Sequence, residues 1–323
     1  MRGWPLIALL LGCSPPPTPQ PESATWHLVR ELDRVALTVH VAGEGDVWVG
    51  GGGLATGPGA LLLHGDGTRF DEIDTGRPET VWWIGGSARD DLWAVGERGL
   101  AMHGDGARWT SVDTGTTATL FGVFARAKDD AWAVGGSPNG AGPTDVLLHW
   151  DGVRWSAIAP PTKGATFFKV WGGDELIVVG LGVALRGDGT TWTELPVPGR
   201  TSLFTVAGGA SGIFAVGGGP ATLLRLGDGG FEPLPLTDTA SGILSGVAVA
   251  PDGSLFVVGE RGQRYRREVG GTLHDDSRDL ELPGIDLHAT AAARGGAFAV
   301  GGNYMALTRP GTKARGVILR YGR

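Results

Sequence analysis

The chain has 323 residues, among them 58 glycines, 12 tryptophans and one cysteine, and its formal net charge is −7. Mild acidity argues against a nucleic-acid backbone as the main partner, because phosphate binding needs a basic face, and a single cysteine excludes an intramolecular disulfide. Glycines at regular intervals between short apolar runs, without an amphipathic helix of three turns, favour an all-β fold with many tight turns.

The start of the chain combines a charged residue, a short apolar stretch and a cysteine. Leu10-Leu11-Gly12-Cys13 resembles the bacterial lipobox, and this resemblance implies cleavage before Cys13 and lipidation of its side chain. Ser14 at the next position implies sorting to the outer membrane. The alternative is a chance cysteine in a signal sequence that is cleaved elsewhere.

The domain organisation that we expect follows from this resemblance. Residues 1–12 would be a lipoprotein signal peptide, and residues 13–24 a lipidated cysteine followed by a proline-rich tether that favours polyproline II. The protein would then be held at the outer membrane by its N-terminal lipid. Whether it faces the periplasm or the cell surface is left open.

From residue 25 to residue 323, one unit recurs with a period near 40 residues, as in propeller repeats. Each unit has an apolar first strand and a second strand such as Asp91–Gly96 (DLWAVG) or Asp130–Gly135 (DAWAVG). A third strand, an Asp-Gly turn that suits a tight hairpin with two positive φ angles, and a fourth strand beginning with an aromatic residue follow. The second strands are marked by Trp48, Trp93, Trp132, Ile177, Phe214, Phe256 and Phe298.

A glycine follows each of these seven residues by two or three positions, with Gly50 in the first unit and Gly96 in the second. Seven units of four strands predict a seven-bladed β-propeller with four-stranded antiparallel blades. The repeated aromatic residues are interpreted as core between blades, because they recur at one position of the unit.

The two ends of the repeat region are incomplete in complementary ways. Residues 25–29 look like a fourth strand that has lost its third strand, and Val317–Arg320 matches a third strand without a fourth. We therefore predict that the N-terminal strand completes the last blade and closes the ring, which removes exposed sheet edges.

With these residues in view, the unit resembles Asp-box (BNR-type) propeller repeats. It is also similar to repeats of the photosystem II assembly-factor family, whose units share the Val-Gly, Gly, Asp-Gly and Trp sequence seen around Val95-Gly96, Asp105-Gly106 and Trp109. In Asp-box families this motif is structural and lies far from the active site, so the resemblance implies a fold and no activity.

Catalytic, cofactor and metal sites are not predicted. The chain has no Gly-x-Ser-x-Gly motif, and the first strands carry few ionisable groups, His40, Lys169 and His288 being the exceptions. A channel lined by small and apolar residues does not suit acid–base chemistry. One third-strand position holds histidine in three units and arginine in others; we interpret it as a structural cation that pairs with the turn aspartate or with a second-strand aspartate, and the three histidines are His64, His103 and His149.

Candidate ligand-binding residues are those outside the repeat pattern. The connections between second and third strands are long at 51–59, 136–144 and 302–316, and long loops are more often functional than incidental. The last of these carries a basic and aromatic set, Tyr304, Arg309, Lys313 and Arg315. Other aromatic residues outside the repeat positions are Trp82, Trp83, Trp150 and Trp171.

We therefore expect a membrane-anchored, monomeric, non-catalytic binding or scaffold module of the bacterial envelope, which recognises a protein or a glycan through one propeller face. An alternative is a carbohydrate-active hydrolase or lyase with an atypical propeller site, which would need several carboxylates and arginines at the channel mouth. A third possibility is a structural envelope protein with no specific ligand.

Overall fold

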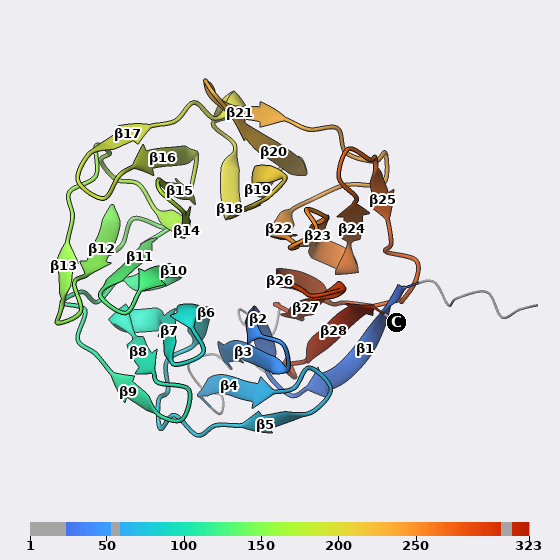
Figure 1. Ribbon diagram of the computed structural model, residues 1–323, viewed down its shortest axis with the longest axis horizontal. Helices are drawn as coiled ribbons and strands as arrows, with labels where there is room; N and C mark the ends of the chain where they lie inside the picture. Colours follow the sequence, from blue (N-terminus) through green and yellow to red (C-terminus); the bar gives the residue numbers. More distant parts are fainter. Residues whose placement is uncertain (1–23, 53–58, 305–311, 323) are drawn as a thin grey trace, which may run out of the picture.

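The computed structural model describes residues 24–52, 59–304 and 312–322. They form seven four-stranded antiparallel sheets arranged around a central axis (Figure 1), which confirms the predicted seven-bladed β-propeller. The helical pieces of the described residues are three short 3-10 turns, η1 (Glu97–Gly99), η2 (Pro198–Arg200) and η3 (Glu260–Gly262).

The strands of each blade follow one another from the axis outward, except in the last blade. Blade 1 holds β2 (Val35–Gly43), β3 (Asp46–Gly52), β4 (Ala60–Gly65) and β5 (Phe70–Glu72). Blade 2 holds β6 (Val81–Ala88), β7 (Asp91–Gly96), β8 (Ala101–Gly104) and β9 (Trp109–Ser111). Blade 3 holds β10 (Thr119–Ala127), β11 (Asp130–Gly136), β12 (Val146–Trp150) and β13 (Trp155–Ala157). Blade 4 holds β14 (Phe167–Gly172), β15 (Leu176–Gly180), β16 (Val183–Gly187) and β17 (Trp192–Glu194).

Blade 5 holds β18 (Ser202–Gly209), β19 (Gly212–Gly218), β20 (Thr222–Gly227) and β21 (Gly230–Pro233). Blade 6 holds β22 (Leu244–Val249), β23 (Leu255–Gly259), β24 (Arg264–Arg267) and β25 (Leu273–Asp275). Blade 7 holds β26 (Asp286–Ala293), β27 (Gly296–Gly302), β28 (Gly316–Gly322) and, as its outer strand, β1 (Thr25–Leu32).

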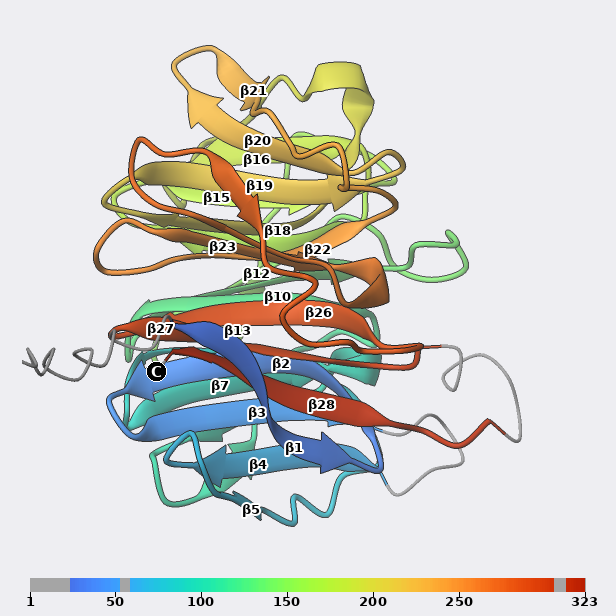
Figure 2. The ribbon, with the colours of Figure 1, turned by 90° about the vertical axis from the view of Figure 1, so that its right-hand side faces the viewer.

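The ring closes as the sequence predicts. β1 pairs with β28 in an antiparallel register that places Trp26 opposite Tyr321 and Leu28 opposite Leu319, and the two strands run side by side in Figure 2. The paired segment extends to Leu32, beyond the predicted end at residue 29. Blade 7 is thereby built from both ends of the described chain.

The core lies between neighbouring blades. At four of the interfaces between blades, the aromatic residue on the second strand of one blade packs against the aromatic residue near the start of the fourth strand of the next. The ring centroids are 5.3 Å apart for Trp48–Trp109, 4.9 Å for Trp93–Trp155, 5.6 Å for Trp132–Trp192 and 6.2 Å for Phe256–Trp26. The last pair crosses the closure, so Trp26 occupies the fourth-strand position that its sequence suggests.

The repeated histidines are structural, and they pair with second-strand aspartates. His103 Nε2 lies 2.7 Å from Asp91 Oδ1, and its ring stacks on Trp93 at a centroid distance of 4.5 Å. His64 with Asp46 and His149 with Asp130 make the same contact at 2.9 and 3.1 Å. Of the two aspartate partners that the sequence left open, the structure selects the second-strand one.

The expected turn geometry at Asp-Gly is wrong in blades 1 to 4. Only the glycine has positive φ there, for example 86° at Gly106, and the connection between β8 and β9 spans four residues. The aspartate instead accepts backbone N–H groups: Asp105 Oδ1 is 2.9 Å from Ala107 N and 2.7 Å from Arg108 N. In blade 5 the strands are joined by two residues, Asp228 and Gly229, because Gly227 pairs with Gly230, but neither of the two has positive φ.

A β-bulge near the start of each inner strand positions side chains at the axis. In all seven blades the register between the first and second strands slips there by one residue, so that two residues oppose one. The extra residues are Leu37, Trp82, Phe121, Phe168, Phe204, Ser245 and His288. They are called the axial bulge residues below.

The repeated glycine of the second strand is required by this bulge. A Cβ at Gly96 or Gly301 would fall inside contact distance of the carbonyl oxygen of Thr80 or Asp286, at the start of the paired inner strand. In blade 1 the residue in this position is Gly51, against Val35, and not the neighbouring Gly50 that the sequence pattern suggested. The glycine period therefore reflects close approach of two backbones.

Candidate functional site

A cavity of about 480 Å³ opens at one mouth of the axis. Six of the seven axial bulge residues line it, Leu37 being buried elsewhere. Pro138, Glu260 and Tyr304 also line it, and each comes from a connection between second and third strands. The cavity therefore lies on the face that the long loops predict; the loop at 51–59 falls mostly outside the described residues.

An arc of six aromatic rings forms most of the wall. Successive ring centroids are 5.1 to 5.8 Å apart, in the order Tyr304, His288, Trp82, Phe121, Phe168 and Phe204. Five of the six are axial bulge residues, so the bulge places them at the axis while their neighbours in sequence remain in the blades. Such a wall offers a large apolar surface and several π faces to a ligand.

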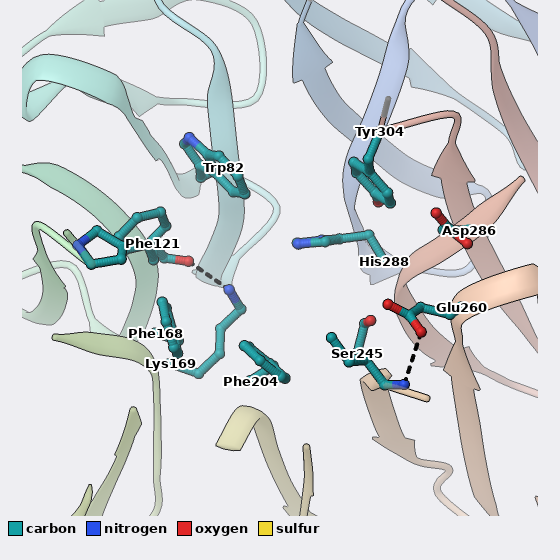
Figure 3. A pocket seen from close by; sticks show the side chains of 12 residues that line it. Trp82, Phe121, Phe168, Lys169, Phe204, Ser245, Glu260, Asp286, His288 and Tyr304 are labelled. Atoms are coloured by element: carbon teal, nitrogen blue, oxygen red, sulfur yellow. Dashed lines mark hydrogen bonds between the residues drawn. The ribbon is translucent and has the colours of Figure 1, made fainter. Parts of the chain in front are cut away.

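A polar wall closes the cavity opposite the four aromatic residues of blades 2 to 5 (Figure 3). It contains Ser245, Glu260 and Asp286. One oxygen of each acid accepts a backbone N–H: Glu260 Oε2 is 3.1 Å from Ile243 N, and Asp286 Oδ1 is 2.7 Å from Arg261 N. The backbone therefore fixes both carboxylates beside the cavity.

Lys169 is the basic residue among those that line the cavity. Its side chain is 4% exposed, and Nζ donates to Phe121 O at 2.6 Å and lies 4.0 Å from the ring centroid of Trp83. Burial lowers the pKa of Lys169 to about 7, because removal from water disfavours the charged amine. Near neutral pH the amine is therefore present in both forms.

His288 presents a hydrogen-bond acceptor to the cavity. Burial, with a smaller contribution from Lys169, lowers its pKa to about 3, so the ring is neutral at physiological pH. Nδ1 contacts Leu37 O, and since a carbonyl only accepts, Nδ1 carries the proton and Nε2 a lone pair. Figure 3 shows the ring reaching from β26 into the cavity.

Tyr304 contributes a buried hydroxyl that has no hydrogen-bond partner among the described residues. Burial, together with Asp286, raises its pKa well above the usual range, so the hydroxyl stays protonated. A buried polar group without a partner is costly unless something binds it.

Of the candidate ligand-binding residues that the sequence singles out, Trp82 and Tyr304 line the cavity. Trp83 packs against the cores of its own blade and its neighbours, under Lys169, and Trp150 is buried against Trp93 and Trp155. Neither of these two residues lines the cavity.

The remaining candidate residues lie away from the cavity or outside the described residues. Trp171 is partly buried in the packing between blades 4 and 5. Lys313 and Arg315 are exposed and do not line the cavity, and the Arg315 guanidinium lies 3.8 Å from Glu31 Oε1. Cys13 and Arg309 lie outside the described residues. Of the basic and aromatic set of the last loop, Tyr304 therefore lines the cavity, whereas Lys313 and Arg315 do not.

Sequence reasoning missed most of the cavity wall. The sequence pattern places Phe121, Phe168 and Phe204 simply in apolar first strands. The predicted lining of small and apolar residues is wrong at this mouth, where aromatic rings and two carboxylates line the cavity. A signal was present: in blades 2 to 5 an aromatic residue directly follows the first buried residue of the inner strand. Two consecutive bulky residues do not fit a period of two unless one of them leaves the register.

Two negative findings apply to the part of the chain that the structure describes. No group of three or more potential metal ligands comes together there. No helix within those same ranges is long and apolar enough to cross a membrane.

Seven four-stranded blades around an axial cavity define a seven-bladed β-propeller. No family model and no curated protein matches the sequence, whereas many solved propellers match the structure. "YCF48 bound to D1 peptide" is 14% identical with a TM-score of 0.66, and the match covers 94% of this chain and 99% of that one.

Two other propellers are similar to the same extent. Virginiamycin B lyase from Staphylococcus aureus is 13% identical with a TM-score of 0.67, over 91% of this chain and 99% of that one. The WD40 propeller domain of Doa1 is 10% identical with a TM-score of 0.64, over 92% and 97%. At these identities the similarity establishes the fold alone.

Proposed function

We propose that the chain is a non-catalytic binding module that holds a segment of a partner protein in the axial cavity. The arc of six aromatic rings carries this proposal, because it gives a cavity of about 480 Å³ a largely apolar wall with a few fixed polar groups, the usual composition of a ligand site. The similarity to a propeller solved with a bound peptide supports a protein segment as the occupant.

The contacts of the polar groups favour binding over catalysis. A nucleophilic mechanism needs a nucleophile, a base and an orienting group in mutual contact. Lys169 and His288 instead bond to the backbone carbonyls of Phe121 and Leu37. The Asp-box-like turns support the same view, because an aspartate such as Asp105 is occupied by its own turn.

Site-directed photo-crosslinking tests the occupant. p-Benzoylphenylalanine at Phe168, inside the cavity, should cross-link a partner polypeptide in cells of the producing organism, and mass spectrometry should identify one recurrent segment. The matched control is p-benzoylphenylalanine at Val153. This residue is 82% exposed and lies on the turn between β12 and β13, on the propeller face opposite the cavity. The absence of a cross-link at Phe168 would refute the proposal. Cross-linked products that contain only glycan would refute it too, and would favour the carbohydrate-active alternative.

We further propose that the module is a lipoprotein of the outer membrane, anchored through Cys13. The order Leu10-Leu11-Gly12-Cys13 supports this. Cys13→Ser should move the protein from the membrane fraction to the wash, because the substitution removes the side chain that carries the lipid anchor. Fractionation followed by mass spectrometry of the N-terminal peptide measures it; a Cys13→Ser protein that stays with membranes after a salt wash contradicts the lipid anchor.

A further inference from the structure

We propose that the axial cavity recognises an arginine side chain of the partner segment, with the alkyl stem and guanidinium plane against the aromatic arc and the guanidinium edge toward the polar wall. This inference rests on the proposed function and assigns a chemistry to the same site.

The two walls of the cavity differ in their chemistry. Trp82, Phe121, Phe168 and Phe204 stand on one side, while Glu260 and Asp286 stand on the other (Figure 3). Aromatic faces attract cations, and carboxylates form charge-assisted hydrogen bonds with them. A cation on an apolar stem satisfies both walls at once.

The polar groups opposite the aromatic residues are rich in hydrogen-bond acceptors. The polar wall offers two carboxylates and the hydroxyl of Ser245, which can donate as well as accept, and His288 of the arc adds the Nε2 lone pair. An uncharged apolar ligand would leave these acceptors unpaired, and an anion would be repelled by two carboxylates. A guanidinium has five donors in a plane and no acceptor, and it stacks on aromatic rings, so it matches this wall better than the compact ammonium of lysine does.

The unpartnered hydroxyl of Tyr304 is an independent observation in the same place. Its oxygen is buried at the cavity beside His288, with which the ring is in contact at a centroid distance of 5.7 Å, and it lacks a hydrogen-bond partner among the described residues. An N–H donor entering the cavity would supply the missing partner for the phenol oxygen.

Lys169 is the group that opposes a cation, and it does so only when protonated. Its pKa is about 7, while His288 and Tyr304 stay neutral through the same range and Glu260 and Asp286 supply the negative charge. Arginine binding should therefore tighten as pH rises from about 6 to about 8, because the competing ammonium loses its proton. Lys169→Met should remove this pH dependence.

Two isosteric peptides test the proposal. Acetyl-Gly-Gly-Arg-Gly-Gly-amide should bind about tenfold more tightly than the same peptide with citrulline, since the guanidinium has both the cation–π and the charged hydrogen-bond contributions. Isothermal titration calorimetry on the folded protein measures both affinities. Equal affinities for the arginine and citrulline peptides would overturn the inference.

The variants that assign the effect keep the backbone bonds intact. Glu260→Gln combined with Asp286→Asn retains an acceptor for Ile243 N and Arg261 N, and should lower arginine-peptide affinity about tenfold while leaving the citrulline peptide unchanged. The matched control is Glu97→Gln. Glu97 lies in the equivalent turn of blade 2, where its Oε2 accepts a hydrogen bond from Thr80 N–H at 3.1 Å, but it does not line the cavity. Circular dichroism confirms folding of each variant.

The outcomes separate this inference from the proposed function. A polypeptide cross-linked at Phe168, with no preference for arginine over citrulline, would refute the arginine assignment and leave the binding module standing. Failure of cross-linking together with absence of peptide binding would refute both.

Discussion

Trp93→Ala should lower the free energy of unfolding by about 3–5 kcal/mol, a large part of the roughly 5–15 kcal/mol that holds a typical domain together. Trp93 is fully buried; it packs against Trp150 and Trp155 of the next blade and stacks on His103. Its indole N–H has no partner among the described residues, so the alanine variant loses packing and leaves a cavity without breaking a hydrogen bond.

Chemical denaturation followed by tryptophan fluorescence and circular dichroism measures this loss. Val153→Ala is the control, because an 82% exposed side chain should change stability by no more than about 0.5 kcal/mol. A loss below about 1 kcal/mol for Trp93→Ala would mean that the indole does not fill the interface between blades 2 and 3.

Removal of β1 should open the ring. Without residues 24–32, β28 becomes an exposed edge strand whose N–H and C=O groups are free to pair with another chain, and the contact of Trp26 with Phe256 and Tyr321 is lost. The truncated protein should show a lower melting temperature and should form higher oligomers or aggregates, as measured by size-exclusion chromatography with light scattering.

A point variant distinguishes the contribution of the β1 backbone from that of the Trp26 side chain. Trp26→Ala keeps the backbone pairs between β1 and β28, so it should destabilise the protein, by about 3–5 kcal/mol, without promoting association. A truncated protein with the same elution volume and melting temperature as the full chain would show that β1 is dispensable for closure.

The propeller could be predicted from sequence because its determinants repeat. Each second-strand aromatic residue and each fourth-strand aromatic residue recur at fixed positions, and the incomplete ends around Trp26 and Val317 complement each other. Trp150 shows where this reasoning fails. It occupies a third-strand position that is glycine in neighbouring blades, such as Gly104 and Gly187, and it fills the space beside Trp155 instead of facing a ligand.

The cavity could be predicted only in part. Trp82 and Tyr304 were identified as irregular aromatic residues, but Phe168 resembles a core residue of an apolar strand. Its position at the axis comes from a one-residue slip in pairing, which depends on the approach of the second-strand glycine. In the sequence this slip shows only as two consecutive bulky residues, Phe167 and Phe168, that break the period of two. Glu260 and Asp286 are 26 residues apart (286 − 260) and are brought to one wall only by the ring.

The axial bulge residues also bear on how such a molecule can change over evolutionary time. Six of these residues face the cavity and are therefore free of the volume constraints inside the blades, and they are tryptophan, phenylalanine, serine and histidine on a shared backbone. Substitutions at these cavity-lining positions can change the ligand specificity while the fold is retained. For protein engineers, the six axial bulge residues that line the cavity are positions for installing a new specificity, and neighbouring ones that contact each other should be changed together.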